Sequence, residues 1–230
     1  DWHNLDNNQF HFTEELVVQN AEGTGNRIPD IVCFVNGLPL VVIEAKRPDS
    51  NKDGKSTNAE AISQHIRNQG QAEIPHLYAY SQLLLAVNGH EGLYATCGTP
   101  EKFWAKWKEE QIPEAEFVRL KNHKLSNEQI GGLFNHRPAK AKDDYLSLVA
   151  AGYLTVTDQD RLIVSLLRPE RLLDMTRLFT LFDKKAGKIV ARYQQVFGIK
   201  ALVERINTFD AAGAREGGVI WHTTGSGKSF

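Results

Sequence analysis

The chain has 230 residues, of which 41% are hydrophobic and 24% charged, the balance of a globular protein with one large domain or one domain and part of a second. Its 27 basic and 28 acidic residues leave a formal net charge of -1, so any contact with nucleic acid must come from a local patch. The apolar runs are too short to span a bilayer and no secretory leader is recognisable, so we expect a cytoplasmic protein without membrane contact. Cys33 and Cys97 lie too far apart in sequence for a Cys-x-x-Cys zinc motif.

The first predicted elements form a β-hairpin. Residues 28–34 and 38–45 are apolar and rich in β-branched side chains, which is typical of strands. They flank Asn36-Gly37, a dipeptide that tolerates positive φ angles and therefore predicts a tight turn. The polar stretch 47–56 that follows predicts a loop.

Helices and one further strand are predicted next. A capping-box pattern predicts a helix over residues 57–69. A second helix is predicted over residues 75–87, because apolar side chains recur there at helical spacing. Residues 93–97 predict a strand, and the Thr-Pro pair at 99–100 predicts the start of a third helix.

The second half of the chain gives weaker signals. We expect loops over residues 112–168, interrupted by a short helix after Ser126 and by another over residues 144–151. The Arg-Pro-Glu triplet at 168–170 predicts the start of a helix, and a long amphipathic helix is expected over residues 188–209.

Charged residues lie at the ends of the two hairpin strands. Glu44 and Lys46 are two apart, so on a strand they project from one face. Hydrolysis of a phosphodiester needs a cation that neutralises the phosphate and acidifies a bound water. Asp30 and Glu44 would supply ligands for Mg²⁺, and the Ala45 carbonyl could add a third oxygen. Lys46 would orient or acidify the attacking water; the alternative is a surface hairpin whose charges are merely solvated.

A shared cation restricts the register of this hairpin. A two-residue Asn36-Gly37 turn would pair Asp30 with Ile43 and leave Glu44 on the opposite face. Asp30 can lie opposite Glu44 only with a three-residue loop or a bulge, which we therefore predict.

Pro29-Asp30 with Glu44-Ala45-Lys46 resembles the motif of the PD-(D/E)xK nuclease superfamily. Many of these nucleases carry a Gln-x-x-x-Tyr motif on the helix after the lysine strand. Gln64 matches its glutamine and is thereby implied as an accessory catalytic residue, whereas Asn68 stands where the tyrosine would be. The departure leaves a hydrated helix face as the competing interpretation of these two residues.

A second motif closes the sequence. Residues 218–222 predict a buried strand that leads into a glycine-rich loop, and such loops bind phosphates through backbone amides, with lysine on the outer phosphates and serine on magnesium. His222 stands where the P-loop pattern has glycine. The predicted nucleotide-binding residues of this loop are Thr224, Gly225, Ser226, Gly227, Lys228 and Ser229.

Together the two motifs resemble the N-terminal part of type I restriction R subunits. The resemblance implies an α/β PD-(D/E)xK fold, with a central mixed sheet flanked by helices and the helical start of a helicase domain. It implies an endonuclease domain over residues 1–168, and over residues 169–230 connecting helices and the beginning of a superfamily 2 motor truncated at the P-loop. Gln195 resembles the glutamine that contacts adenine in such motors.

The resemblance also implies the reaction and its partners. The substrate would be double-stranded DNA, cut with Mg²⁺ after ATP-driven translocation, with ATP acting only in the full-length protein. Specificity and methyltransferase subunits would be the partners. Two other functions stay open: a nuclease-helicase of another repair or phage-defence system, and a non-cleaving DNA-binding module.

Overall fold

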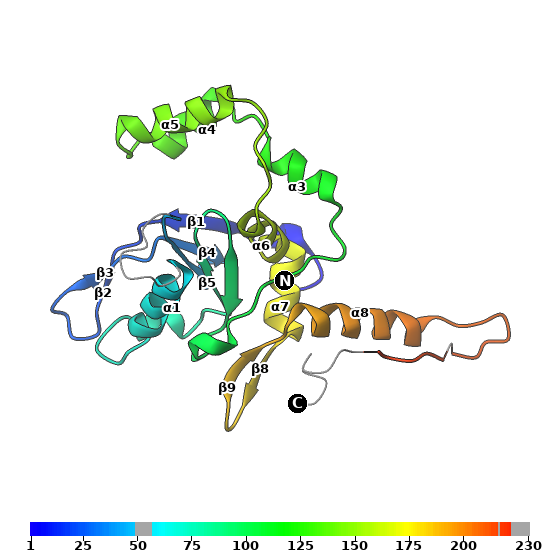
Figure 1. Ribbon diagram of the computed structural model, residues 1–230. Helices are drawn as coiled ribbons and strands as arrows, with labels where there is room; N and C mark the ends of the chain where they lie inside the picture. The colour runs from blue at the N-terminus through cyan, green and yellow to red at the C-terminus, as the bar shows by residue number, and fades with distance from the viewer. Residues whose placement is uncertain (49–56, 216, 222–230) are drawn as a thin grey trace.

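The computed structural model describes residues 1–48, 57–215 and 217–221. Its centre is a five-stranded sheet in the order β1-β4-β5-β6-β7, in which β5 and β6 run parallel and the other neighbours run antiparallel (Figure 1). The strands are β1 (Phe10–Glu14), β4 (Ile31–Val35), β5 (Leu38–Ala45), β6 (Leu83–Val87) and β7 (Gly92–Ala95). This arrangement confirms the predicted α/β fold with a central mixed sheet.

Helices cover both faces of the sheet. One face packs against α1 (Thr57–Asn68) and α2 (Pro75–Tyr78). The other packs against α6 (Asp158–Leu167), α7 (Pro169–Leu178) and the first turn of α8 (Tyr193–Asn207). Strands that are buried on both faces have nearly continuous apolar sequences, and the two central strands β5 and β6 show this pattern.

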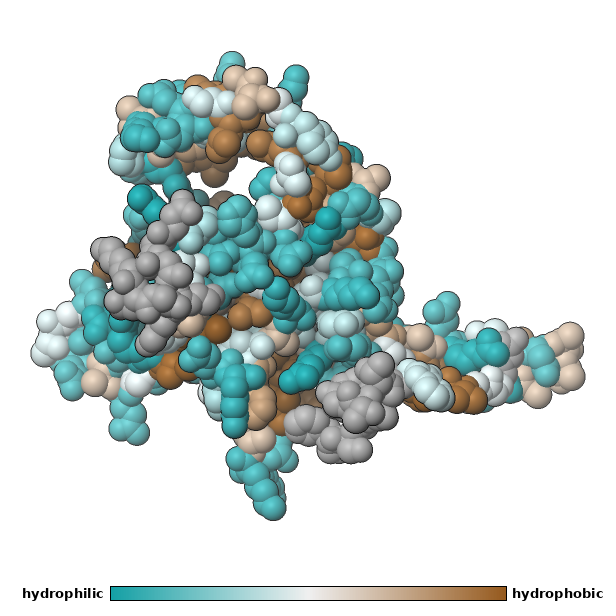
Figure 2. Space-filling model, in the orientation of Figure 1, coloured by the Kyte–Doolittle hydropathy of each residue, from teal (hydrophilic) through white to brown (hydrophobic). Residues whose placement is uncertain are grey.

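The remaining elements lie at the periphery. Two short ribbons pair β2 (Val18–Gln19) with β3 (Asn26–Arg27) and β8 (Thr180–Asp183) with β9 (Gly187–Val190). Helices α4 (Asn127–Phe134) and α5 (Ala139–Ala150) form an arm away from the sheet (Figure 1), with exposed apolar side chains along it (Figure 2). The other peripheral elements are η1 (Leu5–Asn7), η2 (Glu101–Phe103) and α3 (Glu114–Lys121).

The predicted hairpin is present and contains the predicted irregularity. Asn36 and Gly37 form a two-residue turn with φ angles of 51° and 81°, the left-handed values that such a turn requires. Cys33 pairs with Val41, but Phe34 pairs with Pro39, so Leu40 is an extra residue in β5. The register shift is therefore produced by a bulge within the strand and not by a three-residue loop.

The predicted helix over residues 75–87 is wrong beyond its first turn. Only α2 is helical, and residues 83–87 form strand β6. All five residues of β6 are buried, and the strand pairs with β5 on one side and β7 on the other. A five-residue apolar run is compatible with a central strand and with a helix. Residues 83–87 form a strand because β5 and β7 pair with them on both sides.

Four further predictions are corrected. The helix expected at 99–100 is only the single turn η2, and the expected loops over 112–168 contain α3 and α6. The helix expected over 188–209 begins at Tyr193, because residues 187–190 pair with β8 instead. Residues 218–221 are exposed and form no strand, whereas His222 lies outside the described residues.

Within the described residues, no helix combines the length and hydropathy that crossing a membrane would require.

Helix α6 was missed by sequence reasoning although it contributes to the core. Leu162 is 1% exposed and packs where strand β7 begins, so closely that a Cβ on Gly92 would lie 2.5 Å from Leu162 Cδ2. We expect Leu162→Ala to lower the free energy of unfolding by about 2–5 kcal/mol, because it leaves a cavity against the sheet. Urea unfolding measures this change.

The matched control is Leu148→Ala on α5, where the leucine is 57% exposed. It should change stability by no more than about 0.5 kcal/mol. Equal losses in the two variants would contradict the assignment of α6 to the core.

Candidate active site

The bulge brings the three predicted charged residues together at one end of the hairpin. Asp30 immediately precedes β4, and Ile31 pairs with Ile43, so the next pair along is Asp30 with Glu44. Asp30 Oδ2 accepts a hydrogen bond from the Ala45 amide at 2.7 Å. Lys46 Nζ lies 3.9 Å from Asp30 Oδ2 and 4.0 Å from Glu44 Oε2. One ammonium group thus lies between two carboxylates.

Glu44 is the unusual member of this group. Its side chain is 0% exposed, and within the described part of the chain neither carboxylate oxygen has a hydrogen-bond partner. The pKa of Glu44 is raised to about 8, mainly by burial and also by the negative charge of Asp30, while Lys46 opposes the rise. A buried polar group without a hydrogen-bond partner needs an explanation, and a role in binding a cation would supply one.

The donor set fits Mg²⁺. This ion takes oxygen ligands, commonly one or two carboxylates with several waters. Asp30 and Glu44 supply the carboxylates, and the 36% exposure of the Asp30 side chain leaves room for water. Among the described residues no group of three or more His, Cys, Asp or Glu could hold a metal ion.

The two residues predicted on the following helix differ in their surroundings. Gln64 is half-buried on α1, but Asn68 is 1% exposed and so does not lie on a hydrated face. The Arg67 guanidinium donates to Asn68 Oδ1 from Nε and from Nη2, each at 3.3 Å. The competing interpretation of a hydrated face therefore fails for Asn68.

Sequence reasoning missed two buried polar residues near this site, His65 on α1 and Tyr78 on α2. His65 is fully buried on α1, with Nε2 3.0 Å from the Leu85 carbonyl and Nδ1 3.3 Å from the Tyr78 hydroxyl. Burial lowers the pKa of His65 to about 4. A signal was present, because His65 follows Ala61 and Ile62 at the spacing of the buried face of a helix.

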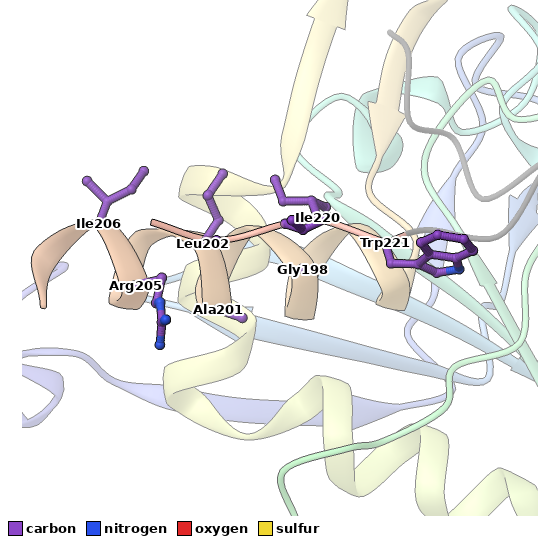
Figure 3. Close-up of a pocket in the computed structure, with 9 residues that line it drawn as sticks. Gly198, Ala201, Leu202, Arg205, Ile206, Ile220 and Trp221 are labelled. Carbon is purple, nitrogen blue, oxygen red and sulfur yellow. The ribbon is translucent and has the colours of Figure 1, made fainter. Parts of the chain in front are cut away.

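The predicted nucleotide-binding loop, residues 224–229, lies outside the described residues. Gln195 lies in the first turn of α8, where its Oε1 accepts from the Arg192 backbone amide at 2.8 Å. Residues 218–221 run alongside α8 and line a pocket with Leu202, Arg205 and Ile206 (Figure 3). Gln195 is not among the residues that line this pocket.

The raised pKa of Glu44 makes stability depend on pH. Between its ordinary pKa near 4.5 and its folded value of about 8, the folded chain binds a proton that the unfolded chain does not. The free energy of unfolding should therefore fall as pH rises through this range, by about 1.4 kcal/mol for each unit of pKa difference. Glu44→Gln removes the titration, so its stability advantage over the wild type should grow from about pH 5 to about pH 8.

Urea unfolding with a chelator at several pH values measures this difference. Glu128→Gln, which changes an exposed glutamate on α4, is the control and should follow the wild-type curve. Parallel curves for Glu44→Gln and wild type would refute the raised pKa.

Comparisons with known proteins address the family. Residues 1–103 match the family described as Type I restriction enzyme R protein N terminus, and residues 194–230 match that described as SWI2/SNF2 ATPase. The whole chain is 33% identical to the putative type I restriction enzyme MjaVIIIP endonuclease subunit of Methanocaldococcus jannaschii. It is 32% identical, again over its whole length, to the type I restriction enzyme HindI endonuclease subunit of Haemophilus influenzae.

The chain spans 18% of the length of each of these two relatives. Both alignments run through the whole chain, and the first family match includes the hairpin with Asp30, Glu44 and Lys46. The chain therefore belongs to the family of type I restriction enzyme R proteins and corresponds to their N-terminal region.

Proposed function

We propose that this chain is the Mg²⁺-dependent endonuclease part of a type I restriction enzyme and that it has the PD-(D/E)xK fold. The observation that carries the proposal is the buried, unpartnered Glu44 carboxylate beside Asp30 and Lys46. The substrate would be double-stranded DNA. The names of the relatives support a role in restriction, because each is an endonuclease subunit of a type I enzyme.

Each residue of the site has a proposed task. Asp30, Glu44 and the Ala45 carbonyl would hold Mg²⁺, which when bound neutralises phosphate charge and acidifies a water. Glu44 would have to be deprotonated to serve as a ligand, since its raised pKa favours the neutral carboxyl group. The Lys46 ammonium, within 4.0 Å of both carboxylates, orients the attacking water and stabilises negative charge in the transition state. Gln64 assists from α1.

The rest of the function concerns the longer protein. We propose that Gln195 and residues 224–229 bind ATP in the full-length protein and that a superfamily 2 motor moves the DNA before cleavage. The match of residues 194–230 to SWI2/SNF2 ATPases supports this assignment. The partners would be the specificity and methyltransferase subunits. The division into residues 1–168 and 169–230 stays a prediction.

Two other functions compete with this proposal. A nuclease-helicase of a repair or other defence system would use the same motifs, but the relatives reported above are restriction subunits. A non-cleaving DNA-binding module would not require a buried carboxylate beside a second carboxylate and a lysine. Destabilising burial of this kind is typical of functional sites.

The proposal predicts a separation of cleavage from ATP hydrolysis. Asp30→Ala, Glu44→Ala and Lys46→Ala should each abolish DNA cleavage in the full-length enzyme, because each removes a ligand or the charge that stabilises the transition state. Gln64→Ala should weaken cleavage less. Plasmid cleavage and ATP hydrolysis are measured on the same preparations, and the ATPase activity should survive every change.

Lys140→Ala is the matched control, since this lysine pairs with Asp144 on the exposed helix α5. It should cleave as the wild type does. Full cleavage by any of the three site variants would refute the assignment of that residue.

The nucleotide site predicts the reverse separation. Lys228→Ala should abolish ATP hydrolysis in the full-length enzyme, because the lysine of a P-loop contacts the outer phosphates. Binding of Mn²⁺ at the Asp30–Glu44 site, measured by calorimetry without nucleotide, should be unchanged. Persistent ATP hydrolysis in this variant would contradict the proposed P-loop.

A further inference from the structure

A row of buried hydrogen bonds connects two helices to the strand beside the candidate site. The carbonyl oxygen of Leu85 on β6 lies 3.0 Å from His65 Nε2, and His65 Nδ1 lies 3.3 Å from the Tyr78 hydroxyl. Leu85 and His65 are 0% exposed, and Tyr78 is 3% exposed. The row crosses from the sheet to α1 and then to α2.

The chemistry of the groups fixes the direction of these bonds. A carbonyl can only accept, so His65 Nε2 carries the proton and donates to Leu85. His65 Nδ1 is then an acceptor and receives the Tyr78 hydroxyl proton. Burial, which lowers the pKa of His65 to about 4, keeps the ring in this neutral form. Burial raises the pKa of the Tyr78 hydroxyl, so this group keeps the proton that it donates.

The row lies on the face of the sheet to which Glu44 projects. In the parallel pairing of β5 with β6, Ile43 is opposite Leu85 and Glu44 is opposite Ala86. Glu44 projects to the same face as Val42, which is the face that α1 and α2 cover. The charges of Lys46 and Asp30 act on the pKa of His65, and the charge of Glu44 acts on that of Tyr78.

Glu44 depends on this neighbourhood for its position. Within the described part of the chain its two oxygens receive no hydrogen bond, so the surrounding packing and the Lys46 ammonium, 4.0 Å from Oε2, hold the carboxylate in place. On the covered side that packing is made by α1 and α2, and His65 and Tyr78 attach both helices to β6. A shift of either helix would move the walls around the carboxylate.

We propose that Tyr78 and His65 are positioning residues that hold the Glu44 carboxylate ready for a divalent cation. This inference rests on the proposed function of the Asp30–Glu44 site. The two residues touch neither cation nor DNA; they act through the helices that enclose Glu44. Partners behind metal ligands commonly change metal affinity by about 10–100-fold when they are removed.

The test compares two buried tyrosines with hydrogen-bonded hydroxyl groups. Tyr78→Phe removes the bond to His65, and Tyr94→Phe removes a 2.9 Å bond to the Ala191 carbonyl on the opposite face of the sheet. Calorimetry with Mn²⁺ on the folded full chain measures affinity, and thermal unfolding measures stability. We expect Tyr78→Phe to weaken Mn²⁺ binding by about ten-fold and Tyr94→Phe to leave it unchanged.

His65 provides a second comparison. His65→Leu should weaken Mn²⁺ binding as Tyr78→Phe does, whereas His65→Gln, which keeps a donor for the Leu85 carbonyl, should restore part of the affinity. Wild-type Mn²⁺ affinity in Tyr78→Phe, or equal weakening in Tyr94→Phe, would overturn the positioning role.

Asp30→Ala separates this inference from the proposed function. Wild-type Mn²⁺ binding that Asp30→Ala abolishes supports the site, so an unchanged Tyr78→Phe then refutes the positioning role alone. Absence of Mn²⁺ binding in the wild-type chain would refute the proposed function, and the inference with it.

Discussion

The register between β4 and β5 is the constraint on which the candidate site depends. With the two-residue turn alone, Asp30 would lie beside Ile43, and its partner carboxylate would project from the other face of the sheet. The extra residue Leu40 changes the register, so that Asp30 comes opposite Glu44. Leu40 is itself 7% exposed and belongs to the core, so burial of its side chain holds the bulge in place. An apolar residue without a partner in the ladder thus decides which charged side chains meet.

The burial of Glu44 shows what this site does to stability. Moving an unpaired carboxylate out of water is strongly unfavourable, and proteins generally avoid the penalty by keeping the group protonated. The raised pKa of Glu44, about 8, reflects this penalty. Val42, two residues earlier on the same face, is an apolar side chain that packs there without penalty. A carboxylate at position 44 does not stabilise the fold, whereas a role in cation binding would explain its presence. Positions where a buried residue departs from the usual apolar pattern are commonly functional.

Sequence alone predicted the elements whose signals are local. The hairpin is defined by Asn36-Gly37, and the need for a bulge followed from counting residues between the two carboxylates. Strand β6 was mistaken for a helix because its assignment depends on β5 and β7, which flank it only in the folded sheet. His65 and Tyr78 are 13 residues apart, and nothing in their spacing reveals that α1 and α2 pack on one face. Residues that meet through tertiary packing are the ones that the sequence could not identify.

The same core joins the central sheet to the segment that matches the ATPase family. Phe197 and Val196, in the first turn of α8, pack in the cluster that covers the sheet face opposite the candidate site. The side chain of Arg171 is 8% exposed, lies over the rings of Trp107 and Phe197, and pairs with Glu109 at 3.4 Å. A buried cation held by two rings and a carboxylate is difficult to displace, because breaking the pair would leave a charge unpaired inside the protein. Helix α8 therefore begins inside the core of the central sheet, while the ATPase match that starts at residue 194 continues beyond it. Because Val196 and Phe197 pack on the sheet that carries Glu44, a rearrangement of the beginning of α8 would disturb that packing.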